Sequence, residues 1–483
     1  MKHTYCIILF FLTTTAHAKF FSRQEEHWDW EKVSLLDVEF PHGFLWGTSE
    51  SALQVEGTIT AHGKTVENSW TLWQSEEIIK NGVKQPRVPR DKRVGDACQR
   101  WTRYKEDVQL IKDLGMNAHR FSLEWSKIEP EKGTFDTIAM EHYIDYAREM
   151  LNNGIVPIPT LFHHTMPTWL IQVHAPRTPG FEDKQTIQEF VTYALYVLNA
   201  FKDAGLLDQI PLWITINEPL AIPMSGYIYN SFPPGKKFKI RTAGIVAKNL
   251  LDAHIATYDA FKKVDPTLKI GFTHIMQPIQ PYRPWNPLDQ IPAKIFDYLV
   301  NDVALEYFKT GSFNWVWLVK DYNPNALNKV DFIGINYYTH TLISMFKERA
   351  RPEEKLSEAY EGKKIKAIYP EGLYLSLQKA ATLGVPLIIT ENGFAYDNLE
   401  LRDEYIKKHI YVIYKAMQEG IDIRGYLFWT LTDCFGWTSA HQSTHGIYKV
   451  NFTTQERIFR PSAQYLVDVI KNKTVPATLL HTM

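Results

Sequence analysis

Two glutamates lie at the ends of apolar runs, and their chemistry is the most informative feature of the sequence. Glu218 directly follows the run 212–217, and Glu391 ends the run 387–391. A carboxylate at the end of a core strand costs free energy unless it is paired or used. One such glutamate could simply form a salt bridge with a neighbouring basic group. Two of them favour an active site, and paired carboxylates can cleave a glycosidic bond, one as acid and the other as nucleophile or base.

Eight short apolar runs are predicted to be the buried parallel strands that position these glutamates. Each is rich in β-branched or aromatic residues, and most have a polar residue near the C-terminal end. The predicted strands are 44–48, 118–125, 156–163, 212–217, 270–274, 332–338, 387–391 and 426–431. Helical patterns lie between them, at 104–114, 143–151, 187–204, 243–264 and 403–418.

The alternation of strands and helices predicts the fold class. A βα repeat of this kind calls for a parallel sheet with helical crossovers. Eight units predict a closed (β/α)8 TIM barrel as one α/β domain with long βα loops, at 75–94, 277–292 and 347–370. An open, doubly wound sheet is the alternative. It is disfavoured because no glycine-rich phosphate turn follows the first strand.

Composition narrows the class of partner. The chain has 483 residues, 45% apolar and 22% charged, which is typical of a folded globular protein. Lys and Arg number 53 against 54 acidic residues, and this balance argues against nucleic acid as a partner. No run beyond the N-terminus reaches the length of a membrane span. No His, Cys or Asp cluster has the spacing of a metal site, so we expect no metal and no cofactor.

The N-terminus has the three parts of a secretory signal. Lys2 is followed by the apolar run 6–12 and by Ala-His-Ala at 16–18. A buried N-terminal strand is the alternative. We expect a signal peptide over 1–18, a lead-in over 19–38, the barrel domain over 39–472 and a tail over 473–483, in a secreted, periplasmic or otherwise exported protein. After cleavage only Cys98 and Cys434 remain, and we expect two separate buried thiols rather than a disulfide.

Several motifs in the order of one family extend this interpretation. They are Phe-Leu-Trp-Gly-Thr at 44–48, Gln-Val-Glu-Gly at 54–57, Trp-x-x-x-Asn-Glu-Pro at 213–219, Gly-Ile-Asn-Tyr-Tyr at 334–338 and Ile-Thr-Glu-Asn-Gly at 389–393. From about residue 40 to residue 465 the chain resembles glycoside hydrolase family 1, the β-glucosidase family. The resemblance implies the same barrel fold and an O-β-glycosidase activity.

The resemblance also implies roles for individual residues. Glu218 matches the general acid/base and Glu391 the nucleophile of a retaining enzyme. Arg120 would lie beside Glu391 and keep it ionised, and Tyr338, paired with Asn336, would donate a hydrogen bond to it. The matched sugar-binding residues are Asn217 for the 2-hydroxyl, Gln54 and His163 for the 3- and 4-hydroxyls, and Trp429 and Trp437 for the aromatic floor and wall. Alone, His163 or Trp429 would be read as an ordinary core residue.

Two departures from the family pattern bear on specificity. The family usually has Trp and then Asp after the histidine of the third strand, whereas this chain has His-His-Thr-Met-Pro at 163–167. That variant resembles a branch containing plant galactolipid-remodelling galactosyltransferases. The family usually reads Asp-Asn-Phe-Glu-Trp after the eighth strand, whereas this chain reads Asp-Cys-Phe-Gly-Trp at 433–437. Gly436 therefore replaces the family's acceptor for the sugar 4- and 6-hydroxyls.

These observations predict a retaining β-glycosidase acting on a small-molecule β-glycoside. The first alternative is a transglycosylase, in which a sugar or lipid acceptor outcompetes water. The second is a non-catalytic sugar-binding protein on a glycosidase scaffold, against which the presence of both Glu218 and Glu391 argues. A 6-phosphate substrate is not expected, because the Ser-x-Lys-x-Tyr pattern of phospho-β-glycosidases is missing from 438–448.

Overall fold

A computed structural model describes most of the chain. The described residues are 28–30, 33, 38–80, 82–171, 179–345, 356–360, 364–395, 398–442, 444–472 and 474–475. The chain divides into two units, Met1–Val33 and Ser34–Met483. In the first unit the rings of Trp28 and Trp30 lie 5.5 Å apart. The predicted signal peptide over 1–18 lies outside the described residues.

The second unit is built on a closed barrel of eight parallel strands, which excludes the open sheet and confirms the predicted fold class. All eight strands coincide with predicted apolar runs. They are β2 (Leu45–Ser49), β5 (Ala118–Ser122), β6 (Val156–Phe162), β7 (Leu212–Asn217), β8 (Lys269–Ile275), β12 (Phe332–Asn336), β16 (Leu387–Asn392) and β17 (Ile423–Trp429). Sequential strands are neighbours, and β17 pairs with β2 to close the ring.

One layer of apolar side chains fills the barrel. It consists of Ala118, Ile158, Ile214, Phe332, Ile388 and Leu427, each at most 2% exposed and each from a different strand. Close strand contact requires glycine at some positions. A Cβ on Gly47 of β2 would lie 1.9 Å from the carbonyl oxygen of Ala118 on β5. The strand ends are therefore held on a packed core rather than around a pore.

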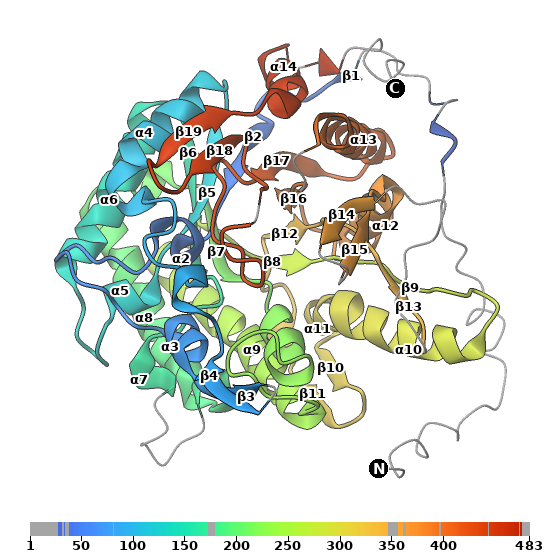
Figure 1. The fold of residues 1–483 in the computed structure, drawn as a ribbon, viewed down its shortest axis with the longest axis horizontal. Helices are drawn as coiled ribbons and strands as arrows, with labels where there is room; N and C mark the ends of the chain where they lie inside the picture. Colours follow the sequence, from blue (N-terminus) through green and yellow to red (C-terminus); the bar gives the residue numbers. More distant parts are fainter. Residues whose placement is uncertain are drawn as a thin grey trace. The chain divides into compact units, whose positions relative to one another are not determined.

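Helices surround the strands in Figure 1. They are α2 (Ala52–Glu56), α3 (Ser69–Ser75), α4 (Arg100–Asp113), α5 (Trp125–Ile128), α6 (Thr137–Asn152), α7 (Thr168–Ile171), α8 (Gln185–Asp203), α9 (Ile240–Val264), α10 (Pro287–Asp297), α11 (Val303–Thr310), α12 (Pro370–Ala381), α13 (Leu399–Gln418) and α14 (Gln464–Asn472). Shorter helical turns are η2 (Arg90–Lys92), η3 (Gly180–Glu182), η4 (Leu207–Gln209), η5 (Pro223–Ile228), η6 (Tyr298–Asp302), η7 (Pro324–Ala326) and η8 (Pro461–Ala463).

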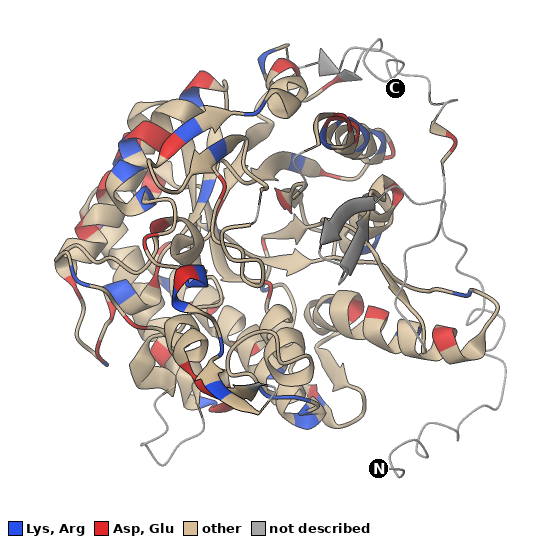
Figure 2. Ribbon diagram, in the orientation of Figure 1, with Lys and Arg blue, Asp and Glu red and all other residues tan. Residues whose placement is uncertain are grey.

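Local sequence explains where these helices begin and end. The Asp136 side chain accepts hydrogen bonds from the amides of Ile138 and Ala139 and so caps α6. Val108 and Ile111 of α4 are buried on one face, and Gly115 adopts a left-handed φ of 76° just beyond the helix end. Both signs of charge are spread over the outer helices in Figure 2, as the near-zero net charge predicts. Within the described residues, no helix is both long and apolar enough to span a membrane.

Segments outside the barrel strands form small two-stranded sheets. The antiparallel pairs are β1 (Val38–Glu39) with β20 (Thr474–Val475), β3 (Glu77–Lys80) with β4 (Val83–Pro86), β10 (Ser312–Trp315) with β11 (Val319–Tyr322), β14 (Leu356–Tyr360) with β15 (Lys364–Ala367), and β18 (Tyr448–Asn451) with β19 (Glu456–Phe459). The parallel pair is β9 (Ile279–Pro281) with β13 (Thr341–Ile343). Cys98 and Cys434 are buried free thiols, as predicted.

Candidate active site

The two glutamates lie at the carboxyl ends of barrel strands. Glu218 follows β7 with a left-handed φ of 46°, and its amide donates to the carbonyl oxygen of Thr273 on β8 at 2.9 Å. Glu391 lies in β16 opposite Asn336 of β12, beside a shift in strand register. Such irregularities re-aim side chains near active sites. Both glutamates are buried, with 8% of Glu218 and 4% of Glu391 exposed.

Both carboxylate oxygens of Glu391 are held by donors. Arg120 Nη1, from β5, donates to Oε1 at 2.7 Å. The Tyr338 hydroxyl donates to Oε2, also at 2.7 Å. These two contacts agree with the contacts predicted for Arg120 and Tyr338. A carboxylate held at both oxygens by a cation and a phenol is fixed in orientation.

Glu218 has a different set of partners. Asn336 Nδ2 donates to its Oε1 at 2.8 Å. His164 Nε2 lies 3.7 Å from its Oε2, which is within ion-pair range but longer than a hydrogen bond. Asn336 and Tyr338 therefore contact different carboxylates. Asn336 lies at the end of β12 and serves the acid/base candidate, whereas Tyr338, two residues further on, serves Glu391.

Asn217 links the two halves of the site. Its Oδ1 accepts from Arg120 Nη2 at 2.6 Å, from Thr273 Oγ1 at 2.7 Å and from Asn336 Nδ2 at 3.1 Å. Its Nδ2 lies 3.0 Å from His163 Nε2 and 3.2 Å from His164 Nε2. Three donors around Oδ1 fix the amide orientation, so both histidine nitrogens face a donor.

Three threonines that sequence analysis did not single out hold this network in place. Besides Thr273, Thr160 accepts from Arg120 Nε at 3.0 Å and Thr390 donates to Asn336 Oδ1 at 2.7 Å. Each interrupts an apolar barrel strand, and a buried hydroxyl within such a strand was the available signal. Gly334 leaves room for two of them. A Cβ there would lie 2.6 Å from Thr390 Oγ1 and 2.7 Å from Thr273 Cγ2.

The residues predicted to bind sugar lie around the same barrel mouth. The ring centroid of His163 is 6.0 Å from that of Trp429 and 6.2 Å from that of Trp437. Gln54 of α2 donates from Nε2 to the Phe435 carbonyl at 2.5 Å. Its Oε1 and the Nδ1 of His163 are buried without a protein partner. Such atoms are suited to hydroxyl groups of a ligand.

The two carboxyl groups titrate as an interacting pair. Burial, together with the negative charge of Glu218, raises the pKa of Glu391 to about 7 against the opposing effect of Arg120. Burial also raises the pKa of Glu218, but His164 and Asn336 outweigh it and leave this pKa below its ordinary value. Arg120 lowers the pKa of Glu391, as expected of an adjacent cation, but desolvation is the larger effect and leaves this pKa above its ordinary value.

The acidic side chain nearest in sequence to Gly436 has its own partner. Asp433, three residues before Gly436, accepts from Arg460 at 2.8 and 2.7 Å.

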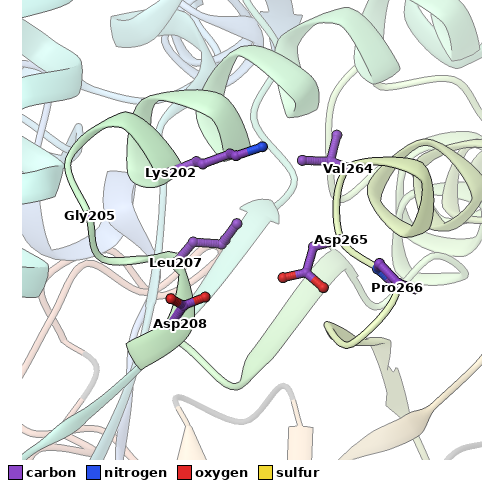
Figure 3. A pocket seen from close by; sticks show the side chains of 7 residues that line it. All are labelled: Lys202, Gly205, Leu207, Asp208, Val264, Asp265 and Pro266. Atoms are coloured by element: carbon purple, nitrogen blue, oxygen red, sulfur yellow. The ribbon is translucent and has the colours of Figure 1, made fainter.

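A separate hollow of about 310 Å³, lined in part by Asp265, is shown in Figure 3. It lies beside the turns that precede β7 and β8, at the amino ends of the strands, opposite the glutamates.

Known proteins match this chain over nearly its full length. The profile of glycosyl hydrolase family 1 matches residues 36–475. Beta-glucosidase A of Thermotoga maritima is 30% identical over 473 residues, covering 90% of this chain and 98% of that protein. The structure of a β-glycosidase from Pyrococcus horikoshii has a TM-score of 0.77 and 29% identity, covering 92% of this chain and 98% of that one.

A third comparison concerns a ligand-bound structure. The β-glucosidase from Thermotoga maritima in complex with glucoimidazole has a TM-score of 0.77 and 28% identity, covering 90% of this chain and 99% of that one. These matches include the barrel and the strand ends that carry the two glutamates, so the protein is a glycoside hydrolase. Within that class, the chain belongs to glycosyl hydrolase family 1.

Proposed function

We propose that this chain is a retaining β-glycosidase in which Glu391 is the nucleophile and Glu218 the acid/base. The observation that supports the proposal is that the two carboxylates at the barrel mouth have different hydrogen-bond partners. Arg120 and Tyr338 hold both oxygens of Glu391, whereas Asn336 holds Glu218. Two carboxyl groups in one small site but in different environments can take different roles in one reaction.

The proposed reaction has two displacements at the anomeric carbon. In the first, Glu391 attacks this carbon, the bond to the leaving oxygen breaks, and that oxygen receives a proton from Glu218. In the second, water attacks the same carbon, its proton passes to Glu218, and the bond to Glu391 breaks. Two inversions return the original configuration.

We expect the first product to be the β-anomer. The retaining mechanism places its carboxyl groups about 5 Å apart, too close for a water between them. Hydrolysis of a panel of aryl β-glycosides, followed by NMR before mutarotation, measures the anomer and the preferred glycone. An α-anomer as first product would exclude the mechanism.

The same assay separates hydrolysis from transfer. Adding a sugar or lipid acceptor would divert the glycosyl group from water if the chain is a transglycosylase. A β-linked transfer product in excess of free sugar would favour that alternative. A protein that binds the glycosides but releases no aglycone would favour the sugar-binding alternative.

Gln54, His163, Asn217, Trp429 and Trp437 form the proposed glycone subsite. The unpartnered Oε1 of Gln54 and Nδ1 of His163 would take hydroxyl groups. Asn217 would bond the 2-hydroxyl, a contact that strengthens in the transition state. Trp429 is 6% exposed and would form the floor beneath an apolar sugar face.

Gly436 sets the specificity that we propose. Its backbone pairs with that of Ala440, with N–O distances of 2.7 and 2.9 Å, so it lies in a tight turn beside Trp437. It offers no side-chain acceptor, and Asp433 is engaged by Arg460. We propose that plain glucose binds weakly here. Sugars altered at position 6 or 4, by acylation, oxidation to a uronic acid or extension, would bind better, with reduced discrimination between gluco and galacto forms.

Replacing Gly436 with Glu should raise kcat/KM for plain β-glucosides by about 10-fold or more. A charged hydrogen bond contributes roughly 1.5–3 kcal/mol, and a glutamate here could accept two. The measurement is kcat/KM for plain and 6-substituted aryl β-glucosides, with Gly436→Gln as the uncharged control of equal size. The 6-substituted substrates should lose activity in both variants. Ordinary wild-type activity on plain glucosides, unchanged by Gly436→Glu, would show the specificity proposal to be wrong.

A further inference from the structure

His164 directly follows His163 at the end of β6 and turns towards Glu218. It has a left-handed φ of 71° and is only 4% exposed. Its ring packs beside two aromatic rings, with its centroid 5.7 Å from those of both Phe232 and Trp437. Its Nε2 is the ring nitrogen that faces Glu218 Oε2, at 3.7 Å.

The position of Nε2 gives His164 two alternative contacts. Without a proton, Nε2 accepts from Asn217 Nδ2, which lies 3.2 Å away. With a proton, Nε2 becomes a donor, and the amide NH2 of Asn217 can no longer serve as its partner. The acceptor within ion-pair range is then the carboxylate of Glu218. Nε2 of His164 therefore lies near both a donor, Asn217 Nδ2, and an acceptor, Glu218 Oε2.

We propose that His164 is a positioning residue for the acid/base, which it pairs with and favours in the ionised form. This inference rests on the proposed role of Glu218. In the first displacement Glu218 gives its proton to the leaving oxygen and becomes an anion. A protonated His164 stabilises that anion until the second displacement, in which water gives a proton back to Glu218. No proton is gained or lost by His164 in the cycle.

The other charged and titratable groups around this pair come from every neighbouring strand. Arg120 on β5 lowers the pKa of Glu218, and Glu218 in turn raises the pKa of Glu391 on β16. Tyr338, after β12, keeps its proton because burial raises its pKa. Burial lowers the pKa of His274 on β8 to about 4, so this histidine is neutral at working pH.

The histidines near Glu218 provide both the residue to be replaced, His164, and a neutral histidine that serves as its control. Burial lowers the pKa of His163 well below its ordinary value, so this ring is neutral as well. His164 Nε2, by contrast, lies within ion-pair range of Glu218 Oε2, at 3.7 Å, and an imidazole is the kind of side chain that can carry a positive charge near neutral pH. An opposite charge at this distance typically lowers a carboxyl pKa by about one unit or more.

The test uses a 2,4-dinitrophenyl β-glycoside, whose leaving group needs no acid. With this substrate the second displacement limits kcat. The acidic limb of the pH profile of kcat then reports the ionisation of Glu218 as the base. We expect His164→Phe to move that limb upward by about one pH unit, which is about a 10-fold loss of kcat below the limb. His164→Gln keeps a donor but no charge and should shift the limb in the same direction. His274→Gln, which removes a neutral buried histidine, should leave it in place.

The outcomes separate this inference from the proposed function. Covalent labelling of Glu391 by a 2-fluoro glycoside, detected by mass spectrometry, shows that each variant is folded. If the limb is unchanged in both His164 variants but lost in Glu218→Ala, His164 does not tune the base and the inference is wrong. If Glu218→Ala keeps the wild-type limb, the assignment of Glu218 itself fails.

Discussion

Replacing Glu391 with Gln should reduce turnover of every β-glycoside by about 10⁴-fold or more, because a neutral amide cannot form the glycosyl-enzyme. The amide has the size of the carboxylate and keeps an oxygen for the Tyr338 hydroxyl, now held at 2.7 Å. Sugar binding should therefore persist. Steady-state kinetics measure the first effect, and calorimetric titration with the glycoside or its free sugar measures the second.

A matched glutamate provides the control for this prediction. Glu400 is exposed in the first turn of α13, the helix that follows β16. Glu400→Gln removes the same charge outside the site and should leave kcat/KM at the wild-type value. Residual activity of Glu391→Gln within 10-fold of wild type would place the nucleophile elsewhere.

Replacing Glu218 with Ala should produce a loss that depends on the leaving group. General acid catalysis contributes about 10²–10⁴-fold, and an alkyl leaving oxygen needs all of it. A dinitrophenolate leaves without protonation, so the first displacement should remain fast for that substrate. The comparison is pre-steady-state kinetics of aglycone release from alkyl and dinitrophenyl β-glycosides.

The second displacement offers an independent readout of the same variant. Without a base, water attacks slowly, whereas azide needs no proton removed. Added azide should restore turnover of the dinitrophenyl substrate and give a β-glycosyl azide. Equal losses at the first step for both leaving groups would show that Glu218 is not the acid.

The pH profile follows from the carboxyl pair. The reactive form holds one proton, on Glu218, with Glu391 ionised. Because the two carboxyl groups titrate as a pair, the pKa of Glu391, raised to about 7, and the lowered pKa of Glu218 are the limits between which the pair carries one proton. The free protein holds this proton mainly on Glu391, and the reaction draws on the fraction of molecules in which it lies on Glu218. Above about pH 7 the acid is lost, and below the lower limit the nucleophile is protonated. Wild-type kcat/KM should be bell-shaped, and its alkaline limb should disappear in Glu218→Ala.

The barrel could be predicted from the sequence because its signals are local. Each strand is a short run of β-branched and aromatic residues such as Ile388, bounded by polar turns, and each run matches an observed strand. The small sheets in the long connections could not be predicted in this way. In the pair β9 and β13, for example, Ile279 lies opposite Thr341, and the residue pattern of neither segment indicates that the two pair.

The sequence predicted which residues form the candidate site but not which of them contact one another. The motifs placed Glu218, Glu391 and Arg120 at strand ends, and the barrel brings them together. Which donor serves which carboxylate depends on register shifts, as between Ile335 and Asn336, that follow from packing rather than pattern. The protonation of Glu391 depends on how completely the fold removes water, and that is a property of the assembled barrel.

The left-handed backbone at Glu218 and His164 has a consequence for the stability of the protein. A residue with a Cβ in this conformation carries strain of about 1–3 kcal/mol, which the surrounding structure must offset. The two residues, with φ values of 46° and 71°, are neighbours in space, since His164 Nε2 lies 3.7 Å from Glu218 Oε2. Glycine would relax the backbone at either position but would supply no acid and no imidazole. At these two neighbouring positions of the barrel mouth, the side chains required for the proposed activity therefore lower the thermodynamic stability of the fold.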